Sequence, residues 1–307
     1  MSGLLVSLQG AVAQGVLWGI MVLGVYITFR LMDIADMTVD GSFALGACVC
    51  AVLVVNKGVN PVLALLVAAA AGVVAGAVTG ILHTVFEIPA ILAGILTQIS
   101  LWSINLRIMG GKSNLPLLKV KTLISGLAAS FGMTQAQASM IVGIVLAVAA
   151  ILFLYWFFGT ELGCSLRATG CNPNMSRAQG INTDFCKVLG LMVSNGLVAL
   201  SSALLAQYQG FADVNMGRGA IVIGLAAVII GEAIFSRIFR NFALRLLSVA
   251  FGSILYYLVL QTVIWMGIDT DLLKMLSALV VAVFLAVPYW KGKYFAKPAK
   301  RGGKNNA

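Results

Sequence analysis

Residues 167–181 read RATGCNPNMSRAQGI, a polar island between two long apolar runs. Within the island, Asn172 and Pro173 form a helix start signal, because asparagine can cap free backbone N–H groups and proline suits the first helical position. Gly180 marks the end of that helix. The pattern predicts a helix of about two turns, and the alternative is an ordinary loop in which Asn172 and Pro173 form only a turn. Such a helix can neither span a bilayer nor be stable alone, so it needs a surface to dock against.

The apolar runs beside the island are typical of the whole chain. Of the 307 residues, 61% are hydrophobic and only 10% are charged, and the mean hydropathy is +1.02. Runs of about 18 or more apolar residues recur, each long enough to cross a hydrocarbon core as a helix. They do not alternate in polarity, as the strands of an outer-membrane barrel do. The composition excludes a soluble domain and predicts an all-α, polytopic membrane protein.

The hydropathy pattern predicts about nine transmembrane helices. They lie at residues 10–30, 38–55, 61–83, 88–108, 137–158, 185–207, 217–235, 246–266 and 272–290. A basic segment without any acidic residue, 291–307, follows the last of them. Such a tail is typical of a cytoplasmic segment in contact with anionic membrane lipids, and it argues against a nucleic-acid site.

The basic tail also sets the predicted orientation. With the C-terminus in the cytoplasm, the island and Arg30 lie on the cytoplasmic side, and that side has the larger share of basic residues, as the positive-inside rule requires. A further short span within the long connection 110–135 would move the N-terminus to the other side of the membrane. We expect one transmembrane domain, residues 1–307.

A short sequence repeat relates the two halves of the chain. Residues 34–41 read IADMTVDG and residues 211–217 read FADVNMG, and a span rich in small side chains follows each. In the predicted topology the first copy lies at the cytoplasmic face and the second at the outer face. This is the pattern of an inverted repeat, in which two halves of opposite orientation build one pathway. The halves are approximately residues 10–158 and 185–290.

Four blocks of sequence together resemble a known family. They are GVYITFRLMDIADMTVDGSFALGA (24–47), EIPAILAGILTQISLWSINLRIMG (87–110), the island, and ALLAQYQGFADVNMGRGAIVIGLAAVIIGE (203–232). As a set they resemble the membrane subunits of ABC importers of the branched-chain amino acid and ribose type. They are most similar to the single-permease branch of that group, which is associated with uptake of amino acids or similar small solutes. The resemblance extends over nearly the whole chain.

The resemblance implies specific partners. In this family the island, with its flank at residues 165–181, is a coupling segment in a groove of a separate ATPase subunit, which binds the ATP. A substrate-binding protein delivers solute to the outer face of the bacterial cytoplasmic (inner) membrane, and we expect two copies of this chain to enclose the pathway. The implied coupling residues, with Arg177 as the polar contact to the ATPase, are Arg167, Asn172, Pro173, Arg177, Gly180 and Ile181.

Polar residues in or near the spans are the candidates for the translocation pathway. They are Asp36, Thr38, Asp40, Ser42, Asn195, Asp213 and Asn215. Carboxylates at such positions are costly, so they face protein, water or the interface. The structural interpretation of the cluster 36–42 is that Asp40 or Ser42 caps a half-helix that begins inside the membrane. That role is compatible with a broken helix lining the pathway.

Two further features have a structural interpretation. Asn195, Ser201, Ser202 and Gln207 follow one another along a single predicted span, and hydrogen bonding between helices is favoured over contact with solute. Glu232 lies near the cytoplasmic end of another span, which indicates an ion pair or an interface position rather than a buried proton relay.

The sequence contains no recognisable catalytic or energy-coupling motif. Its five cysteines and one histidine lack metal-ligand spacing. Residues 110–113 read GGKS, but Leu106 stands where a phosphate-binding loop needs its first glycine. An importer built on this chain therefore needs ATP hydrolysed by a partner. The alternatives are a secondary transporter that uses Asp40 as a proton or ion site, and a membrane scaffold that transports nothing.

Overall fold

The computed structural model describes residues 2–118, 120–235 and 241–266, together with 275, 278–279, 281–283 and 286. The elements, in chain order, are α1 (Ser2–Tyr26), a π-helical turn η1 (Ile27–Leu31), α2 (Thr38–Lys57), α3 (Pro61–Thr84), α4 (Ala90–Ile108), β1 (Asn114–Pro116), α5 (Leu123–Phe131), α6 (Gln135–Gly159), α7 (Glu161–Cys171), α8 (Pro173–Ala178), α9 (Thr183–Gln209), β2 (Phe211–Asp213), α10 (Ala220–Phe235) and α11 (Phe242–Trp265).

The prediction of an all-α, polytopic membrane protein is confirmed, but the count of nine spans is not. Within the described residues, seven helices are long and apolar enough to cross a membrane, namely α1, α2, α3, α4, α6, α9 and α11. The span predicted at 217–235 is a shorter helix, α10, of 16 residues. The span predicted at 272–290 and the tail 291–307 lie largely or wholly outside the described residues.

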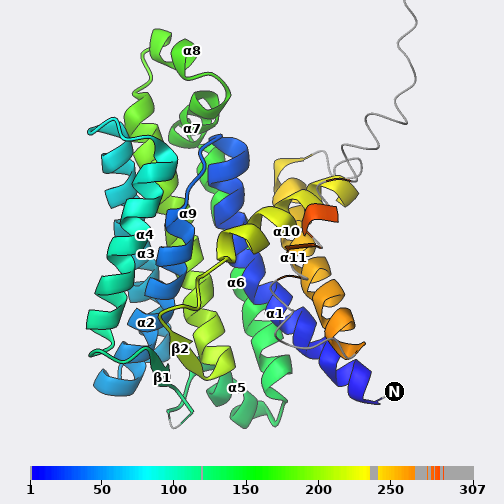
Figure 1. The fold of residues 1–307 in the computed structure, drawn as a ribbon. Coiled ribbons are helices and arrows are strands. Elements are labelled where there is room, and N and C mark those ends of the chain that lie inside the picture. Colours follow the sequence, from blue (N-terminus) through cyan, green and yellow to red (C-terminus); the bar gives the residue numbers. More distant parts are fainter. Residues whose placement is uncertain are drawn as a thin grey trace, which may run out of the picture.

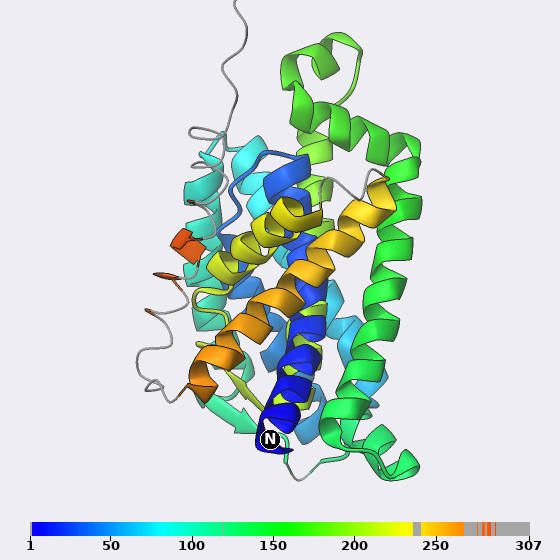
Figure 2. The same cartoon turned by 90° about the vertical axis from the view of Figure 1, so that its right-hand side faces the viewer.

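The long helices run roughly along one common direction (Figures 1 and 2). Helices α7 and α8 project at one end, which we call the α8 end. The two-stranded antiparallel ribbon of β1 and β2 lies toward the opposite end, the ribbon end, together with α5 and the N-terminus. The nine residues of α5 are too few to span a bilayer, so α5 adds no crossing to the connection 110–135.

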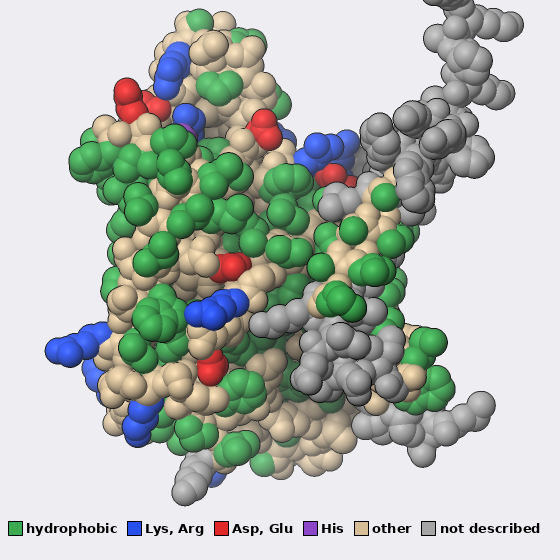
Figure 3. Space-filling view, viewed as in Figure 1, with side chains coloured by type: hydrophobic (Ala, Val, Ile, Leu, Met, Phe, Trp, Pro, Cys, Tyr) green, Lys and Arg blue, Asp and Glu red, His purple; other side chains and the backbone are tan. Residues whose placement is uncertain are grey.

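The bundle has an inner and an outer set of helices. In α1, α2 and α9 most residues of the apolar span are buried inside the protein, whereas in α3, α4, α6 and α11 fewer than half are. The exposed side chains of the outer set are largely apolar, as with Leu66 on α3, Ile99 on α4 and Trp156 on α6. Figure 3 shows such apolar side chains over much of one face, interrupted by a few charged ones. This surface suits lipid or another membrane chain.

A row of glycines lets α3 pack closely against α9. Gly72, Gly76 and Gly80 are spaced four residues apart and therefore lie on one face of α3. A Cβ atom at any of the three would overlap the backbone of α9, at Asn195, Leu191 or Val188 respectively. Small residues at this spacing allow membrane helices to approach closely and gain dispersion contacts.

Two helices begin in the interior of the bundle. After η1 the chain turns back through residues 32–37, the first break, and α2 starts at Thr38. After α9 it turns back through residues 210–219, the second break, and α10 starts at Ala220. Ser42 in the first turns of α2 is hydrogen-bonded to Asn195, which lies roughly 20 Å from either end of α9. The start of α2 is therefore near the middle of the bundle.

Candidate functional site

A chain of buried hydrogen bonds joins the first break to α2 and α9. The carboxylate of Asp36 accepts from the backbone N–H of Thr38 (2.9 Å) and from Asn195 Nδ2 (2.7 Å). Asn195 Oδ1 in turn accepts from Ser42 Oγ at 2.5 Å. Asp36, Ser42 and Asn195 are at most 3% exposed. A carboxylate is tolerated at this depth because both of its oxygens have hydrogen-bond donors.

A second buried chain of hydroxyl groups continues from α2 into α3 and α4. Thr38 Oγ1 lies 2.7 Å from Thr79 Oγ1 of α3, and the Thr79 hydroxyl donates to Thr97 Oγ1 of α4 at 2.9 Å. All three threonines are buried. Together the two series of hydrogen bonds connect the first break to α2, α3, α4 and α9. Several side chains therefore hold the break in one conformation.

Asp40 makes a different contact from the one that the sequence predicts. Its carboxylate accepts the backbone N–H groups of Gly219 (3.0 Å) and Ile221 (2.9 Å), so it caps the start of α10, the other interrupted helix. The donor nearest the start of α2, Thr38 N, is bound by Asp36 instead. The prediction that Asp40 or Ser42 caps its own half-helix is therefore wrong, because the second break lies directly against Asp40 and the hydroxyl of Ser42 donates to Asn195.

The two copies of the sequence repeat share a local geometry. Asp36 Oδ1 accepts the N–H of Thr38, two residues on, and Asp213 Oδ1 accepts the N–H of Asn215, also two residues on. Each aspartate thus forms an Asx turn just before the chain enters an interrupted helix. The copies also meet, since a Cβ atom at Gly217 would overlap the backbone carbonyl oxygen of Asp40. Paired turns of this kind are expected of an inverted repeat. They support the predicted repeat, which stays a prediction.

A cavity of about 360 Å³ lies beside the meeting point of the two breaks. Its lining comes from α2, α4 and the second break, and consists of Asp40, Gly41, Ala44, Gln98, Ile99, Trp102, Asn105, Val214 and Arg218. Trp102 Nε1 donates to Asn215 Oδ1 at 3.4 Å at its edge. The cavity runs from mid-depth, at Asp40, toward the ribbon end, where Asn105 stands near the end of α4.

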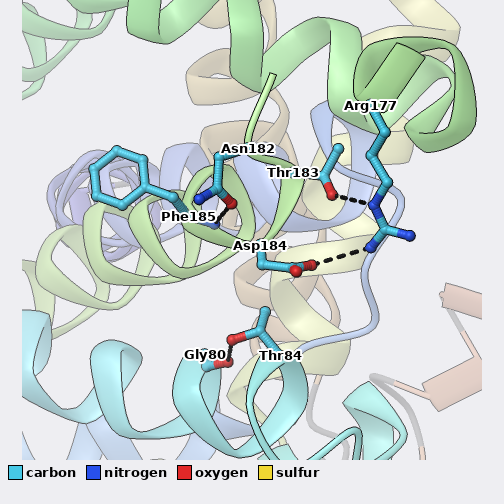
Figure 4. A network of polar contacts seen from close by, with 7 residues as sticks. All are labelled: Gly80, Thr84, Arg177, Asn182, Thr183, Asp184 and Phe185. Carbon is cyan, nitrogen blue, oxygen red and sulfur yellow. Dashed lines mark hydrogen bonds and ion pairs between the residues drawn. The ribbon is translucent and has the colours of Figure 1, made fainter. Parts of the chain in front are cut away.

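At the α8 end, the helix within the island begins where the sequence predicts, and its side chains bond to the start of α9. Asn172 caps α8 through Oδ1, which accepts the N–H of Met175 at 3.1 Å, and Pro173 opens the helix. Arg177 Nε donates to Thr183 Oγ1 at 2.8 Å, and its Nη2 lies 3.2 Å from Asp184 Oδ1 (Figure 4). Arg177 is more than half exposed, so part of its guanidinium is still free to meet a partner.

The other predicted coupling residues lie around α8. Gly180 ends the α8 turn with φ +81°, a conformation that favours glycine, and the N–H of Ile181 donates back to Ser176 O at 3.0 Å. Arg167 belongs instead to the preceding helix α7, where its guanidinium lies 5.4 Å from the ring centre of Phe242 in α11. The structure thus gathers five of the six residues at α8 and places Arg167 one helix earlier.

An ion pair links the two halves of the chain close to this end. Arg30 Nε of η1 lies 3.0 Å from Glu232 Oε1 of α10. The predicted ion pair of Glu232 is therefore confirmed, with Arg30 as its partner. Both side chains are partly exposed, which makes the pair a surface contact.

Hydrogen bonding between helices, predicted for the polar residues of α9, is confirmed for three of the four. Asn195 binds the first break and α2, and Ser201 Oγ donates to Leu17 O of α1 at 2.8 Å. Gln207 Oε1 accepts the N–H of Leu123 at the start of α5 (2.9 Å). Ser202 Oγ donates to Ala199 O within α9 itself.

Several residues of the site were not singled out from the sequence. They are Thr79, Thr97, Gln98, Trp102, Asn105 and Arg218. Four of them lie on α4, and their spacing of four and three residues along 98, 102 and 105 was the available signal for one polar helix face. Among the described residues no group of three or more His, Cys, Asp or Glu side chains converges to hold a metal ion.

Comparison with known proteins gives a consistent result. A family model described as "Branched-chain amino acid transport system / permease component" matches residues 7–287. A tyrosine transport system permease protein of Clostridioides difficile is 41% identical over 290 residues, which cover 93% of this chain and 91% of that protein. An uncharacterized protein of Rickettsia prowazekii is 34% identical, covering 90% and 95% of the two chains. An autoinducer 2 import system permease protein of Salmonella typhi is 29% identical, covering 65% and 56%. No solved structure matches significantly.

Proposed function

Since the chain belongs to the family of branched-chain amino acid transport system permease components, the membrane subunits of ABC importers, we propose that it moves an amino acid across the bacterial cytoplasmic membrane. The substrate class is supported by the relative that is 41% identical over nearly the full length of both proteins and is named for tyrosine transport. The relatives named for autoinducer 2 import are less similar and match a smaller share of the chain.

The observation that carries the proposal is the meeting of two interrupted helices beside a mid-depth cavity whose lining includes Asp40 and Arg218. Helix starts inside a membrane are stable only where their N–H groups find acceptors, and transporters place such starts at the solute pathway. Here Asp40 supplies the acceptors for α10, and Asp40 also lines the cavity. We place the pathway along α4 and the second break, with Asp40 and Asn215 exposed to it.

The other predicted pathway residues have a supporting role in this proposal. Asp36, Thr38, Ser42 and Asn195 are buried and bonded to protein groups, so they hold the first break in place without touching solute. Asp213 shapes the second break through its Asx turn. A change in the position of α9 would then be transmitted to both breaks.

The α8 end is the proposed docking surface for the ATPase subunits. Met175 of α8 and Phe185 of α9 expose more than half of their surface there, which suits burial in a groove of a partner. Arg177 fastens α8 to the start of α9, and Asn195 lies at the middle of the same helix. Closure of the ATPases on ATP would push α8, and α9 would pass that displacement to the first break.

The remaining partners follow from the same proposal. A substrate-binding protein would dock at the ribbon end, toward which the cavity runs, and the C-terminal segment would lie in the cytoplasm. A second copy would pack on the exposed faces that flank the cavity, so that two permeases enclose one pathway. ATP would be bound by the partner chain and not by this one.

The test is uptake by a reconstituted complex. The chain is co-expressed with an ABC ATPase and a substrate-binding protein, placed in proteoliposomes, and assayed with radiolabelled L-tyrosine, L-leucine and L-alanine. Uptake that needs ATP inside the vesicles and persists when ionophores collapse ion gradients is the expected result. Uptake that continues without ATP and stops with the ionophores would favour the secondary transporter with Asp40 as its ion site.

A further inference from the structure

We propose that the cavity between α2, α4 and the second break is a binding subsite for the zwitterionic backbone of an α-amino acid. Arg218 would take the carboxylate and Asp40 the ammonium group, and the amide of Asn105 would bond to the same two groups. The proposal rests on the proposed function and deepens it, because it gives the permease itself a part in recognising the solute. The volume of the cavity, about 360 Å³, lies within the range of roughly 300 to 1,000 Å³ that is usual for small-molecule pockets.

Arg218 is a charge in need of a partner. It precedes Gly219, whose N–H is bound by Asp40 at mid-depth, so its backbone lies deep in the membrane region. Its side chain is exposed and forms no ion pair with any residue that the structure describes. An unpaired guanidinium facing lipid at this depth is costly, which indicates that it faces an aqueous path or a ligand. The planar guanidinium matches a carboxylate in a two-pronged contact.

Asp40 can still accept a cation although it caps α10. Each of its two oxygens accepts one backbone N–H, and an ionised carboxylate has about four acceptor positions in all. Asp40 and Arg218 line the same cavity, yet the two form no ion pair with each other. A cavity that offers one acid and one base, not paired to each other, complements a solute with both charges.

Asn105 provides independent evidence that the cavity takes a ligand. Its side chain is 0% exposed, and neither Nδ2 nor Oδ1 has a hydrogen-bond partner among the described residues. A buried amide without partners is destabilising by about 1–3 kcal/mol per group, so native proteins rarely keep one unless something binds it. Asn105 lies in the wall of the cavity, and a rotation of its side chain on binding would let a solute supply both its missing donor and its missing acceptor.

Trp102 completes the lining with an aromatic surface. Its indole N–H already donates to Asn215, which fixes the ring at the cavity edge, and 45% of the residue remains exposed. The ring face can pack against an apolar or aromatic solute side chain, or against the ammonium group. The subsite therefore recognises what all α-amino acids share and leaves room for a side chain beside Trp102.

The first experiment measures solute binding to the purified permease–ATPase complex without any substrate-binding protein. Saturation-transfer NMR is recorded with L-tyrosine, L-leucine and L-alanine, and with two analogues of tyrosine, tyramine without the carboxylate and 3-(4-hydroxyphenyl)propanoate without the ammonium group. L-tyrosine or another of the amino acids binds, and the analogues bind more weakly. Arg218→Gln weakens amino acid binding roughly tenfold to a hundredfold, and Arg218→Lys retains more of it. The control Arg107→Gln, an exposed arginine at the end of α4 outside the cavity lining, leaves binding unchanged.

The second experiment separates solute contact from a structural role. Asn105→Leu removes a buried amide that has no partner among the described residues, so the melting temperature of the complex should stay the same or rise. Amino acid binding by the same variant should fall. A variant that loses both stability and binding, or that binds as the wild type does, overturns the role of Asn105.

The outcomes distinguish this proposal from the proposed function. Suppose that the complex takes up amino acids in proteoliposomes. If it then binds none without the substrate-binding protein, or if Arg218→Gln binds them as well as the wild type, the subsite alone is overturned. If the complex binds the three amino acids through Arg218 but shows no ATP-dependent uptake of any of them, the importer proposal is overturned and the subsite is retained. If a water molecule or a residue of the second copy, and not the solute, binds the amide of Asn105, then Asn105→Leu will bind amino acids as the wild type does.

Discussion

Asn195 Nδ2 donates a hydrogen bond of 2.7 Å to Asp36 Oδ2 across 159 positions of sequence. Through this contact the helix that begins beside α8 holds the backbone segment from which α2 starts. The bond lies about 18 Å along α9 from Thr183. A displacement at the α8 end therefore has a direct mechanical route to the middle of the membrane.

Asn195→Leu should destabilise the protein by about 2–3 kcal/mol. The substitution removes the donor to Asp36 Oδ2, which is buried, and the Asn195 acceptor of the Ser42 hydroxyl. The measurement is the melting temperature in detergent. Ser100→Ala serves as the control, since Ser100 is exposed and donates only to Leu96 O in its own helix. Equal melting temperatures for wild type and Asn195→Leu would contradict this account of the first break.

Gly76→Ala should destabilise by about 1–3 kcal/mol, because the added methyl group would overlap the backbone of α9 at Leu191 and force α3 away from it. Gly126→Ala in α5 is the matched control. A Cβ atom there meets nothing within 4 Å, and alanine is the better helix former. We expect the control to melt at the same temperature as the wild type or higher. If the two variants behave alike, close packing of α3 on α9 is not what the glycine row provides.

Arg177→Glu should reduce the amount of ATPase subunit that co-purifies with the permease by about tenfold, and uptake with it, as for loss of a charged contact at an interface. The same change breaks the contacts of Arg177 with Thr183 and Asp184, so a second variant is needed. The double variant Arg177→Glu with Asp184→Arg restores the internal ion pair with the charges exchanged. Lys57→Glu, an exposed charge reversal at the ribbon end, is the control for co-purification of the ATPase.

The double variant decides which role Arg177 has. Partner binding that stays low in the double variant supports direct contact of Arg177 with the ATPase. Full recovery would show that Arg177 only fastens α8 to α9. Normal assembly by the single variant would contradict both roles.

Removal of the Arg30–Glu232 ion pair should change stability by less than about 1 kcal/mol, since both side chains are partly exposed and solvent screens the interaction. Arg30→Ala, Glu232→Ala and the double variant form a cycle whose coupling energy is read from melting temperatures at low and high salt. The coupling should shrink as salt is added. A coupling of several kcal/mol that is insensitive to salt would show that the pair is desolvated in the assembled complex.

The spans could be predicted from the sequence because their cause is local. Each of the seven long helices is a continuous apolar run, and hydropathy reports it directly. Helix α10 was predicted three residues too long because hydropathy does not register that the segment 214–219 consists of turns. Helix α7 was not predicted, since its residues are too polar for a span and its N-cap, Thr160, precedes the island.

The site could be predicted only in part because its contacts join distant residues. The repeat motif directed attention to Asp36, Asp40 and Asp213 as costly residues in an apolar chain. The partner of Asp40 is 179 and 181 positions away, and no local pattern reports which helix start a carboxylate meets. Arg218 and Asn105 are unremarkable as single polar residues at the edges of apolar runs. Their interest lies in the partners that the described structure does not give them.

The contact between Gly217 and Asp40 constrains the ancestry of such a chain. In the aligned motifs, Asp36 corresponds to Asp213, Thr38 to Asn215 and Asp40 to Gly217. If the motifs descend from one duplicated segment, the two daughters began with the same residue at the last position, where no side chain fits on one side and a carboxylate caps a helix on the other. Identical halves could not satisfy both demands. A shared aspartate would collide with the facing backbone at the second copy, and a shared glycine would leave the start of α10 without its cap, so this contact needs different residues at the two positions.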